Sequence, residues 1–321
     1  MAEVAVTGGY NRGQEGYAVI GIETTAIAPD TATLPAVPTL ALMGYANVPS
    51  AQRTNGSTKI FAAGSPYPLA NRKNRRENNL SGTMTLGDGA GPVTLIQSSI
   101  RSNTTQTLAA RSLCLPYICI GRGAVGACDA TRSKASLYRY GLVSSLGLSV
   151  TPESGAMLNY SVVALTGQTS TALTTSTVNH AAIATAGGAP YAWDHLSVLI
   201  GGLEWRAYIA SIDLQINNGV TARLMRTQQT GGESNPLTRA PRDIMPGNED
   251  NSLSITLAAP FPSTLVDFST IVIALANGVH SHTFTLSTNE NNELTEGAVD
   301  NGGDFSYTAG ILAGGVGYVY A

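Results

Sequence analysis

Charge is scarce in this chain. Lys, Arg, Asp and Glu make up 12% of its 321 residues, whereas they make up roughly 25% of an ordinary soluble protein. The net charge at pH 7 is −3, so the chain lacks the basic footprint by which proteins grip nucleic acid. Aromatic residues are also few, at 6%, which argues against a cleft built from acidic groups and aromatic rings.

Long apolar runs and a leader segment are missing as well. No run of about 18 apolar residues occurs, so we expect no transmembrane helix. The first residues, 1–9, lack a basic region followed by an apolar stretch, which predicts that there is no secretory signal. We therefore expect a soluble protein made in a cytoplasm.

What the chain does contain is an ordinary amount of core-forming material. Hydrophobic residues make up 43%, and 35 Gly and 15 Pro indicate many turns. This content is too apolar for a disordered chain. A protein with a normal core but few surface charges often covers its surface with copies of itself, which favours self-assembly.

The length predicts two domains or one large one. The stretch 167–190 is built from Ser, Thr, Ala and Gly without charged residues. It lacks the large apolar groups that offset the entropy of ordering, so we predict a linker there. The linker divides the chain into a first domain, 1–166, and a second domain, 191–321.

Weak internal matches support a duplication. Residues 19–23 resemble 199–204, and Leu40 and Leu42 match Ile212 and Leu214. Further along, 83–86 resembles 254–257, and 92–96 resembles 262–266. The matches keep their order and their offset drifts slowly, as a few small insertions and deletions would produce.

The secondary structure reads as mainly β. Ile212, Leu214 and Ile216 alternate with polar residues, which is the period-2 pattern of a half-buried strand. Pro suits the first turn of a helix, so Pro92 and Pro262 each predict one short helix. We expect two strand-rich domains in tandem, each with one short helix.

Two long irregular stretches are predicted as loops, 49–79 and 227–251, at corresponding places in the halves. Loops of this length are usually functional or disordered. The first carries a basic cluster, for which phosphate contact, a solvated loop and subunit contact are the alternatives. The candidate inter-ring or subunit contacts are Arg72, Lys73, Arg75 and Arg76 in the first loop and Glu233, Asp243, Glu249 and Asp250 in the second. A basic loop facing an acidic loop would set orientation.

Signals for catalysis, cofactors and metals are weak, and we expect none of these sites. Residues 121–126 fit G-x-G-x-x-G, but no acidic residue follows about 20 residues on, so these glycines are interpreted as a turn. The three cysteines, Cys114, Cys119 and Cys128, lack zinc-ligand spacing and are expected to be buried thiols. His280 and His282 share a strand face, but no third ligand is evident.

Several segments together resemble the tail tube proteins (major tail proteins) of long-tailed bacteriophages. The segments that carry the resemblance are 198–202, 211–218, 253–257, 146–155 and 160–167. They cover roughly residues 140–260, and the remainder resembles the family only by pattern. The extra residues of the first half, about 104–140, hold all three cysteines and form an insertion relative to the second half.

The resemblance implies that the two tandem domains are tail-tube-like β-sandwiches or half-barrels, and that the chain is a structural protein rather than an enzyme. Its subunits would pair edge to edge into rings, and the rings would stack into the tail tube through which genomic DNA passes during ejection. If the chain is a duplication, three chains would make a pseudo-hexameric ring, and if it is not, the family's usual ring of six chains is expected. The family further implies contacts with tape measure, tail terminator and distal tail proteins, location in the virion tail after assembly in the host cytoplasm, passage of double-stranded DNA without specific binding, and no membrane or cofactor.

Two other classes remain as alternatives. A capsid decoration or fibre protein on a β-sandwich would form a monomer or a single trimer that never stacks. A hydrolase or sugar-binding module on a β scaffold would need clustered acids and aromatics.

Overall fold

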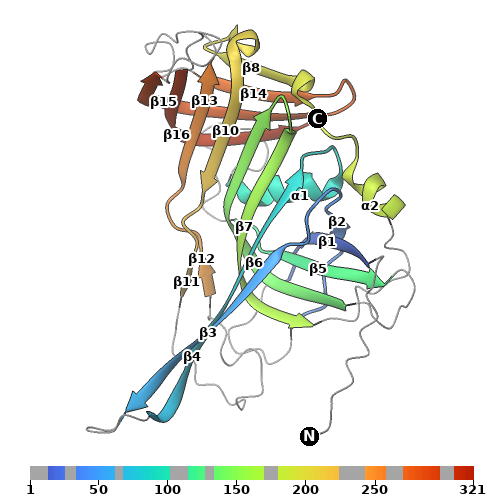
Figure 1. The fold of residues 1–321 in the computed structure, drawn as a ribbon, viewed down its shortest axis with the longest axis vertical. Coiled ribbons are helices and arrows are strands. Elements are labelled where there is room, and N and C mark those ends of the chain that lie inside the picture. The colour runs from blue at the N-terminus through green and yellow to red at the C-terminus, as the bar shows by residue number, and fades with distance from the viewer. Residues whose placement is uncertain are drawn as a thin grey trace, which may run out of the picture.

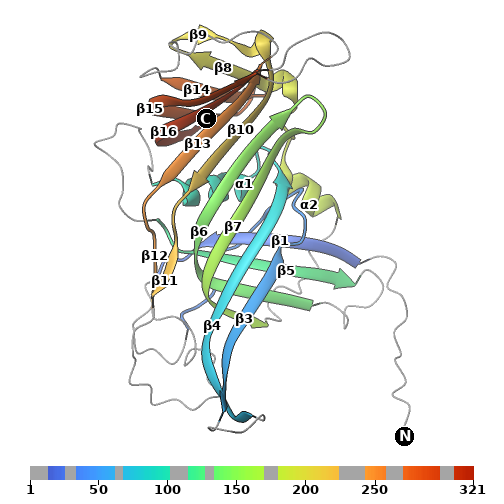
Figure 2. The same cartoon turned by 60° about the vertical axis from the view of Figure 1, so that its left-hand side comes forward.

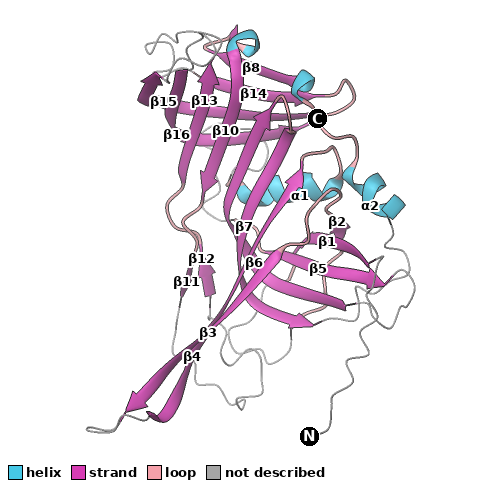
Figure 3. Ribbon diagram, in the orientation of Figure 1, coloured by secondary structure: helices cyan, strands magenta, loops and turns pink. Residues whose placement is uncertain are grey.

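The computed structural model describes residues 14–25, 34–61, 68–101, 115–126, 134–169, 180–223, 243–257, 270–296 and 307–321. The described chain is mainly β (Figure 3), which confirms the fold class predicted from the alternating strands.

The described elements of the first half are strands apart from one helix. They are β1 (Gln14–Ile22), β2 (Ala41–Leu42), β3 (Ser50–Phe61), β4 (Pro68–Thr85), α1 (Ala90–Ser99), β5 (Ile118–Gly126), β6 (Lys134–Thr151) and β7 (Gly155–Thr169). A second helix, α2 (His180–Gly187), follows in the segment between the halves.

The second half is built in the same way, with two short 3-10 turns, η3 (Trp193–His195) and η4 (Arg206–Tyr208). Its described strands are β8 (Leu196–Ile200), β9 (Leu203–Glu204), β10 (Ile209–Asn217), β11 (Thr221–Arg223), β12 (Asp243–Met245), β13 (Asp250–Leu257), β14 (Ile271–Ala276), β15 (Ser281–Glu296) and β16 (Tyr307–Tyr320).

One antiparallel sheet runs through both halves (Figures 1 and 2). Eight of its described strands follow one another in the order β3-β4-β7-β6-β10-β13-β16-β15, and we call this run the central sheet. β5, β1 and β2 continue the sheet from the N-terminal part of β6. β14, β8 and β9 continue it from the N-terminal part of β15.

The described strands of the two halves have the same order. Hydrogen-bonded neighbours run β1-β5-β6-β7-β4-β3 in the first half and β8-β14-β15-β16-β13-β10 in the second, and corresponding strands follow the same order along the chain. β2 lies beside β1 as β9 lies beside β8. We interpret this shared order as two copies of one unit, although the copies share one sheet and one core.

The sequence matches agree with this correspondence in part. Residues 19–22 lie in β1 and 199–200 in β8, while 83–85 lie in β4 and 254–257 in β13. The match of Leu40 and Leu42 to Ile212 and Leu214 is wrong, because Leu40 and Leu42 lie before and in β2, whereas Ile212 and Leu214 lie in β10. Alternating apolar residues recur in many strands, so a short match of this kind can join two strands that are not counterparts. The fourth match involves 262–266, outside the described residues.

The core lies on one face of the central sheet and crosses the junction of the halves. The alternation predicted for β10 is present, since Ile212, Leu214 and Ile216 are at most 1% exposed. They join one cluster with Leu148 of β6 and Leu95 of α1. Pro92 lies in the first turn of α1, as expected, where its missing N–H costs no helical bond. The helix predicted at Pro262 lies outside the described residues.

Three stretches differ from their expected form. Residues 49–79 were expected as a loop, but nearly all of those described belong to the β3–β4 hairpin, whose tip projects beyond the rest of the described chain (Figures 1 and 2). Its polar sequence lacks the apolar alternation by which strands are found. The glycine motif 121–126 lies inside β5 rather than in a turn, between β1 and β6. The described part of the insertion 104–140 includes β5 and the start of β6, which are counterparts of β14 and β15.

The segment 167–190, expected as a linker, has regular structure at both described ends. Residues 167–169 end β7, and 180–187 form α2. Pro190 then forms a β-bridge with Gly87. Of the second long loop, 227–251, the described residues include β12 and the first residues of β13, and β11 pairs with β12.

Candidate assembly surface

The face of the central sheet opposite the core is mostly polar, with the exposed Leu312 among its residues. One row of directly paired residues crosses seven strands. The row is Thr83, Asn159, Gly147, Gln215, Ser252, Leu312 and Glu290. A shallow groove of about 320 Å³ follows this face over β10, β13 and β16, where Gly310 contributes no side chain.

This face carries no positive charge over the paired segments. The segments 79–85, 145–151, 155–163, 209–217, 250–257, 289–296 and 307–314 contain no Lys or Arg. The acidic residues with described side chains on this face are Asp213, Asp250 and Glu290. A surface of this kind does not attract phosphates, so a polyanion can lie near it without being held.

The two halves meet at a ladder between β6 and β10, which we call the seam. It pairs residues 145–150 with 217–212. Beyond its end lies Asn218, which is fully buried and donates through its side-chain amide to the carbonyls of Ser99 (2.8 Å) and Val143 (3.1 Å). Its backbone N–H donates to the carbonyl of Ser144 (2.8 Å). The end of α1, β6 and β10 are therefore tied together by one side chain.

A second junction joins the halves at the start of α1. The carbonyl of Gly87 lies 3.2 Å from Nε2 of His282, and the carbonyl of Asp88 accepts a hydrogen bond from the Tyr320 hydroxyl (2.9 Å). The Asp88 carboxylate accepts from Asn277 Nδ2 (3.1 Å). These bonds fix the position of the second half relative to α1.

His282 is buried in this junction and has a defined proton arrangement. A carbonyl can only accept, so Nε2 donates to Gly87 and Nδ1 accepts from the Tyr318 hydroxyl at 2.7 Å. Burial lowers the pKa of His282 to about 4, which keeps the ring neutral near pH 7. The pairing of His280 with His282 as metal ligands is not supported, and the described residues hold no group of three His, Cys, Asp or Glu suited to a metal.

The two ends of the central sheet are open edges among the described strands. β3 pairs with β4, and no described strand lies on its other side. β15 pairs with β16 up to Glu296, but its ladder to β14 ends at Leu286. Beyond Leu286, no described strand continues that side. Open edges invite pairing with another chain.

The basic candidates lie on the projecting hairpin. Arg72, Lys73 and Arg76 take part in the β4 ladder to β3, and Arg75 falls in its register shift. The structure thus brings these four residues onto one strand, β4 of the projecting hairpin (Figure 1).

The acidic candidates that the structure describes lie in the second half, at or between the starts of β12 and β13. Glu233 lies outside the described residues, Asp243 begins β12 and Asp250 begins β13. Oε2 of Glu249 lies 3.9 Å from Nε of Arg101 in the same chain. Ile244, the residue after Asp243, is buried against Tyr140, Leu142 and Leu165 of the first half.

The only described cysteine, Cys119, is buried. Burial, with the nearby Glu23 carboxylate, raises the pKa of its thiol to about 12, so it is protonated and unreactive at neutral pH. This confirms the expected buried thiol at Cys119. Cys114 and Cys128 lie outside the described residues.

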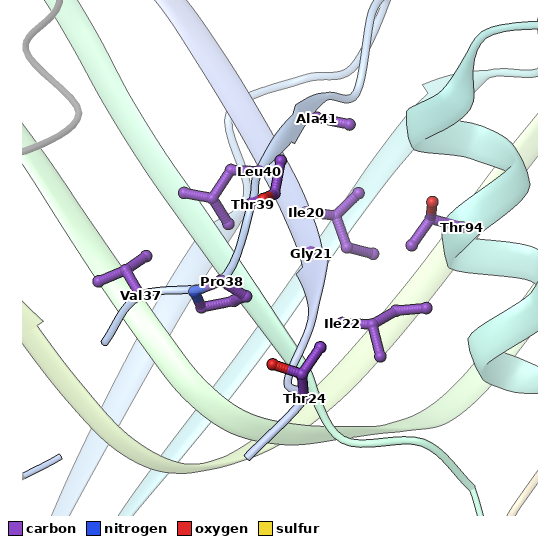
Figure 4. Close-up of a pocket in the computed structure, with 10 residues that line it drawn as sticks. All are labelled: Ile20, Gly21, Ile22, Thr24, Val37, Pro38, Thr39, Leu40, Ala41 and Thr94. Carbon is purple, nitrogen blue, oxygen red and sulfur yellow. The ribbon is translucent and has the colours of Figure 1, made fainter. Parts of the chain in front are cut away.

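A groove of about 510 Å³ lies between α1, β1 and the segment leading into β2 (Figure 4). Ile22 and Val37, both about two-fifths exposed, line it with Thr24, Thr39 and Thr94. None of its lining residues is titratable, so it offers apolar contact and hydroxyl groups rather than acid–base chemistry.

Sequence reasoning missed the open edges and Asn218. The edges depend on which strands pair, and pairing between distant segments leaves no local signal. Asn218 was part of a segment quoted for its resemblance, but a lone Asn after a strand usually indicates a turn.

No protein-family model matches the chain, and no curated protein matches it. Among the described residues, no helix is long and apolar enough to cross a membrane.

Proposed function

We propose that this chain is a structural protein that polymerises as stacked rings into the tail tube of a long-tailed bacteriophage. The observation that carries the proposal is the central sheet, which has one polar face without cations and, among the described strands, an open edge at each end. In the internal seam, two such edges already pair, because β6 of the first half forms an antiparallel ladder with β10 of the second. A sheet whose ends meet those of its neighbours becomes a closed barrel, which leaves no exposed edge.

The size of such a barrel follows from strand spacing. Strands lie about 4.8 Å apart and tilt by about 35–45° in closed barrels. Three chains, each contributing the eight strands of the central sheet, would form a barrel about 45–52 Å across its backbone. Side chains standing about 5 Å from the backbone leave a channel of about 35–42 Å. A DNA double helix fits such a channel.

The polar face suits the lining of this channel, because the opposite face is occupied by the core. Its acidic residues would keep DNA from adhering during ejection. The β3–β4 hairpin reaches beyond the body of the chain and carries the four basic residues. It is the element suited to contact the next ring.

The remaining partners follow from the same proposal. A tube of this kind encloses a tape measure protein and ends at terminator and distal tail proteins, so the chain would reside in the virion tail after assembly in the host cytoplasm. The proposal assigns it no catalytic role, cofactor or membrane.

Negative-stain electron microscopy of the purified chain tests the proposal. We expect rings or stacked tubes with a central channel of about 35–42 Å. Single trimers that never stack at high protein concentration would instead indicate a decoration or fibre protein. A compact monomer with a sugar-binding or hydrolytic activity would overturn the proposal in favour of a β-scaffold module.

A further inference from the structure

We propose that residues 290–296 of β15 form an antiparallel ladder with residues 46–52 of a second copy of this chain, in the register of the internal seam. The proposal rests on the proposed function only in its expectation that successive ladders close into a ring. It assigns the two open edges to each other and fixes which residues lie opposite.

The β15 side of the register follows from the ladders themselves. Met84 and Ile255 correspond in the two halves, because 83–86 matches 254–257 in sequence and β4 and β13 hold the same place in the two strand orders. From Met84, paired residues lead to Leu158 and then to Leu148 in β6. From Ile255, they lead to Ala309 and then to Leu294 in β15. Leu294 is therefore the counterpart of Leu148.

The ends of the neighbouring ladders give the same offset between β6 and β15 to within one residue. The ladder of β6 with β5 ends at Gly141, and the ladder of β15 with β14 ends at Leu286. These two residues are 145 positions apart in the sequence, and Leu148 and Leu294 are 146 apart. Both strands also contain a register shift nearby, after Val143 in β6 and after Asn291 in β15.

The β3 side is found in the same way. Met84 bridges Ala46, whereas Ile255 pairs with Ile212. Further along, Leu80 pairs with Ala51, and its counterpart Asn251 pairs with Ile216. The segment 46–52 is thus the counterpart of the β10 segment that forms the seam.

The seam then predicts the intermolecular pairs. Asn217 lies opposite Ser145 in the seam. Followed through β7 and β16, the ladders make Glu290 the counterpart of Ser145, because the register shift after Asn291 takes up one residue. Gln52 pairs with Asn79 as Asn217 pairs with Asp250, so Gln52 of one copy should lie opposite Glu290 of the next. The Gln52 and Glu290 side chains are both exposed, and the Gln52 amide can donate to the carboxylate. At the other end of the ladder, Ala46 should lie opposite Glu296.

The β3 edge is also suited to a specific partner rather than to any strand. Pro49 has no N–H, and its carbonyl already accepts a hydrogen bond from Arg122. A proline on an edge strand interrupts pairing with arbitrary strands. Only a partner that tolerates a gap at this position can form the remaining bonds.

The two edges of one chain cannot meet each other in the described fold. They lie at opposite ends of the eight strands of the central sheet, so seven spacings of about 4.8 Å separate them, or roughly 34 Å for an uncurled sheet. A second copy is the occupant whose edge carries the matching repeat position.

Disulfide trapping tests the register. With the native cysteines replaced, the variant Gln52→Cys/Glu290→Cys should cross-link between chains on mild oxidation, because disulfides require Cα atoms within about 7 Å. The matched positive control is Ser145→Cys/Asn217→Cys, the corresponding pair of the internal seam, which should cross-link within one chain. The negative control, Gln52→Cys/Ser287→Cys, is three residues out of register. Non-reducing gel electrophoresis and electron microscopy are read on the same samples.

Covalent oligomers that reach a limit at three chains, with little product from the negative control, support the inference. Rings in the microscope without cross-linking at Gln52 and Glu290, while the seam control reacts, would overturn the inference and leave the proposed function standing. Closed covalent trimers that never stack would support the ladder and contradict the tube. A chain that stays folded and monomeric, with no intermolecular product at high concentration, would overturn both the intermolecular ladder and the proposed function.

Discussion

Asn218 of the second half donates a 2.8 Å hydrogen bond to the carbonyl of Ser99, the last residue of α1 in the first half. The same amide donates to the carbonyl of Val143 in β6. Both bonds are shielded from water, because Asn218 is fully buried. One side chain therefore closes the helix terminus and fixes the angle at which β10 leaves the seam.

Replacing Asn218 by Ala should destabilise the folded chain by about 2–3 kcal/mol, because two buried carbonyls lose their donor. Asn218→Asp should cost at least as much, since a carboxylate cannot donate and its charge would be buried. Denaturant unfolding measures both effects. Asn159→Ala, an exposed Asn on the polar face, is the control. Equal midpoints for Asn218→Ala and the control would refute this role.

Stability should fall on acidification through His282. The pKa of His282 is lowered by burial to about 4, against an ordinary value of 6.5. The unfolded chain therefore binds a proton between these values while the folded chain does not, so folding loses stability as the pH falls from about 6.5 to about 4. The full contribution is about 3 kcal/mol.

The variant His282→Gln isolates this effect, because Gln can still donate to Gly87 but does not titrate in this range. Unfolding free energies at pH 7, 6 and 5 should fall less steeply for the variant than for the native chain. If the unfolding free energies of the variant and the native chain fall equally with pH, His282 does not contribute to the loss of stability in acid.

The buried ion pair of Arg139 and Glu23 should be costly to break from one side. The guanidinium donates two bonds to the carboxylate, at 2.8 and 2.7 Å, and both side chains are at most 2% exposed. Glu23→Gln or Arg139→Met alone should cost about 3–5 kcal/mol, because each leaves a buried group without its counter-charge.

The double variant Glu23→Gln/Arg139→Met should recover part of that loss, since neither charge is then buried alone. The exposed pair Arg206–Asp194, at 3.6 Å, is the control, and Asp194→Asn should change stability little. Fully additive losses in the double variant would contradict the coupling.

Removing the projecting hairpin should separate ring formation from stacking. Thr54 and Glu77 are paired across β3 and β4, so residues 55–76 can be replaced by an Asn-Gly turn. We expect folded rings that no longer form tubes, as judged by electron microscopy. Tubes of normal length from this variant would exclude the hairpin from stacking.

Charge reversal of Arg72, Lys73, Arg75 and Arg76 to Glu tests the basic cluster alone. Stacking should weaken, and because exposed charges are screened by salt, the difference from the native chain should shrink at high salt. Tube lengths unchanged at low salt would return this cluster to a solvated surface of the hairpin.

The mainly β fold, the apolar face of β10, the helix at Pro92 and the buried Cys119 could all be predicted, because each depends on a local pattern. The hairpin at 50–85 could not, since its charged and amide-rich sequence lacks the apolar alternation of a half-buried strand. Nor could the seam and the open edges. They arise because β6 is long enough to pair with β5 through one part and with β10 through the other, and no local property of residues 134–151 specifies the second partner.

In the proposed tube, three copies of the chain join their sheet edges into one ring. Light scattering coupled to size-exclusion chromatography, on the same rings whose channel is measured by electron microscopy, tests it most directly. We predict a ring mass of three chains with a channel of about 35–42 Å. A ring of six chains with a channel of that same width would rule out the three-chain ring, because each chain would then contribute only half of its central sheet to the wall.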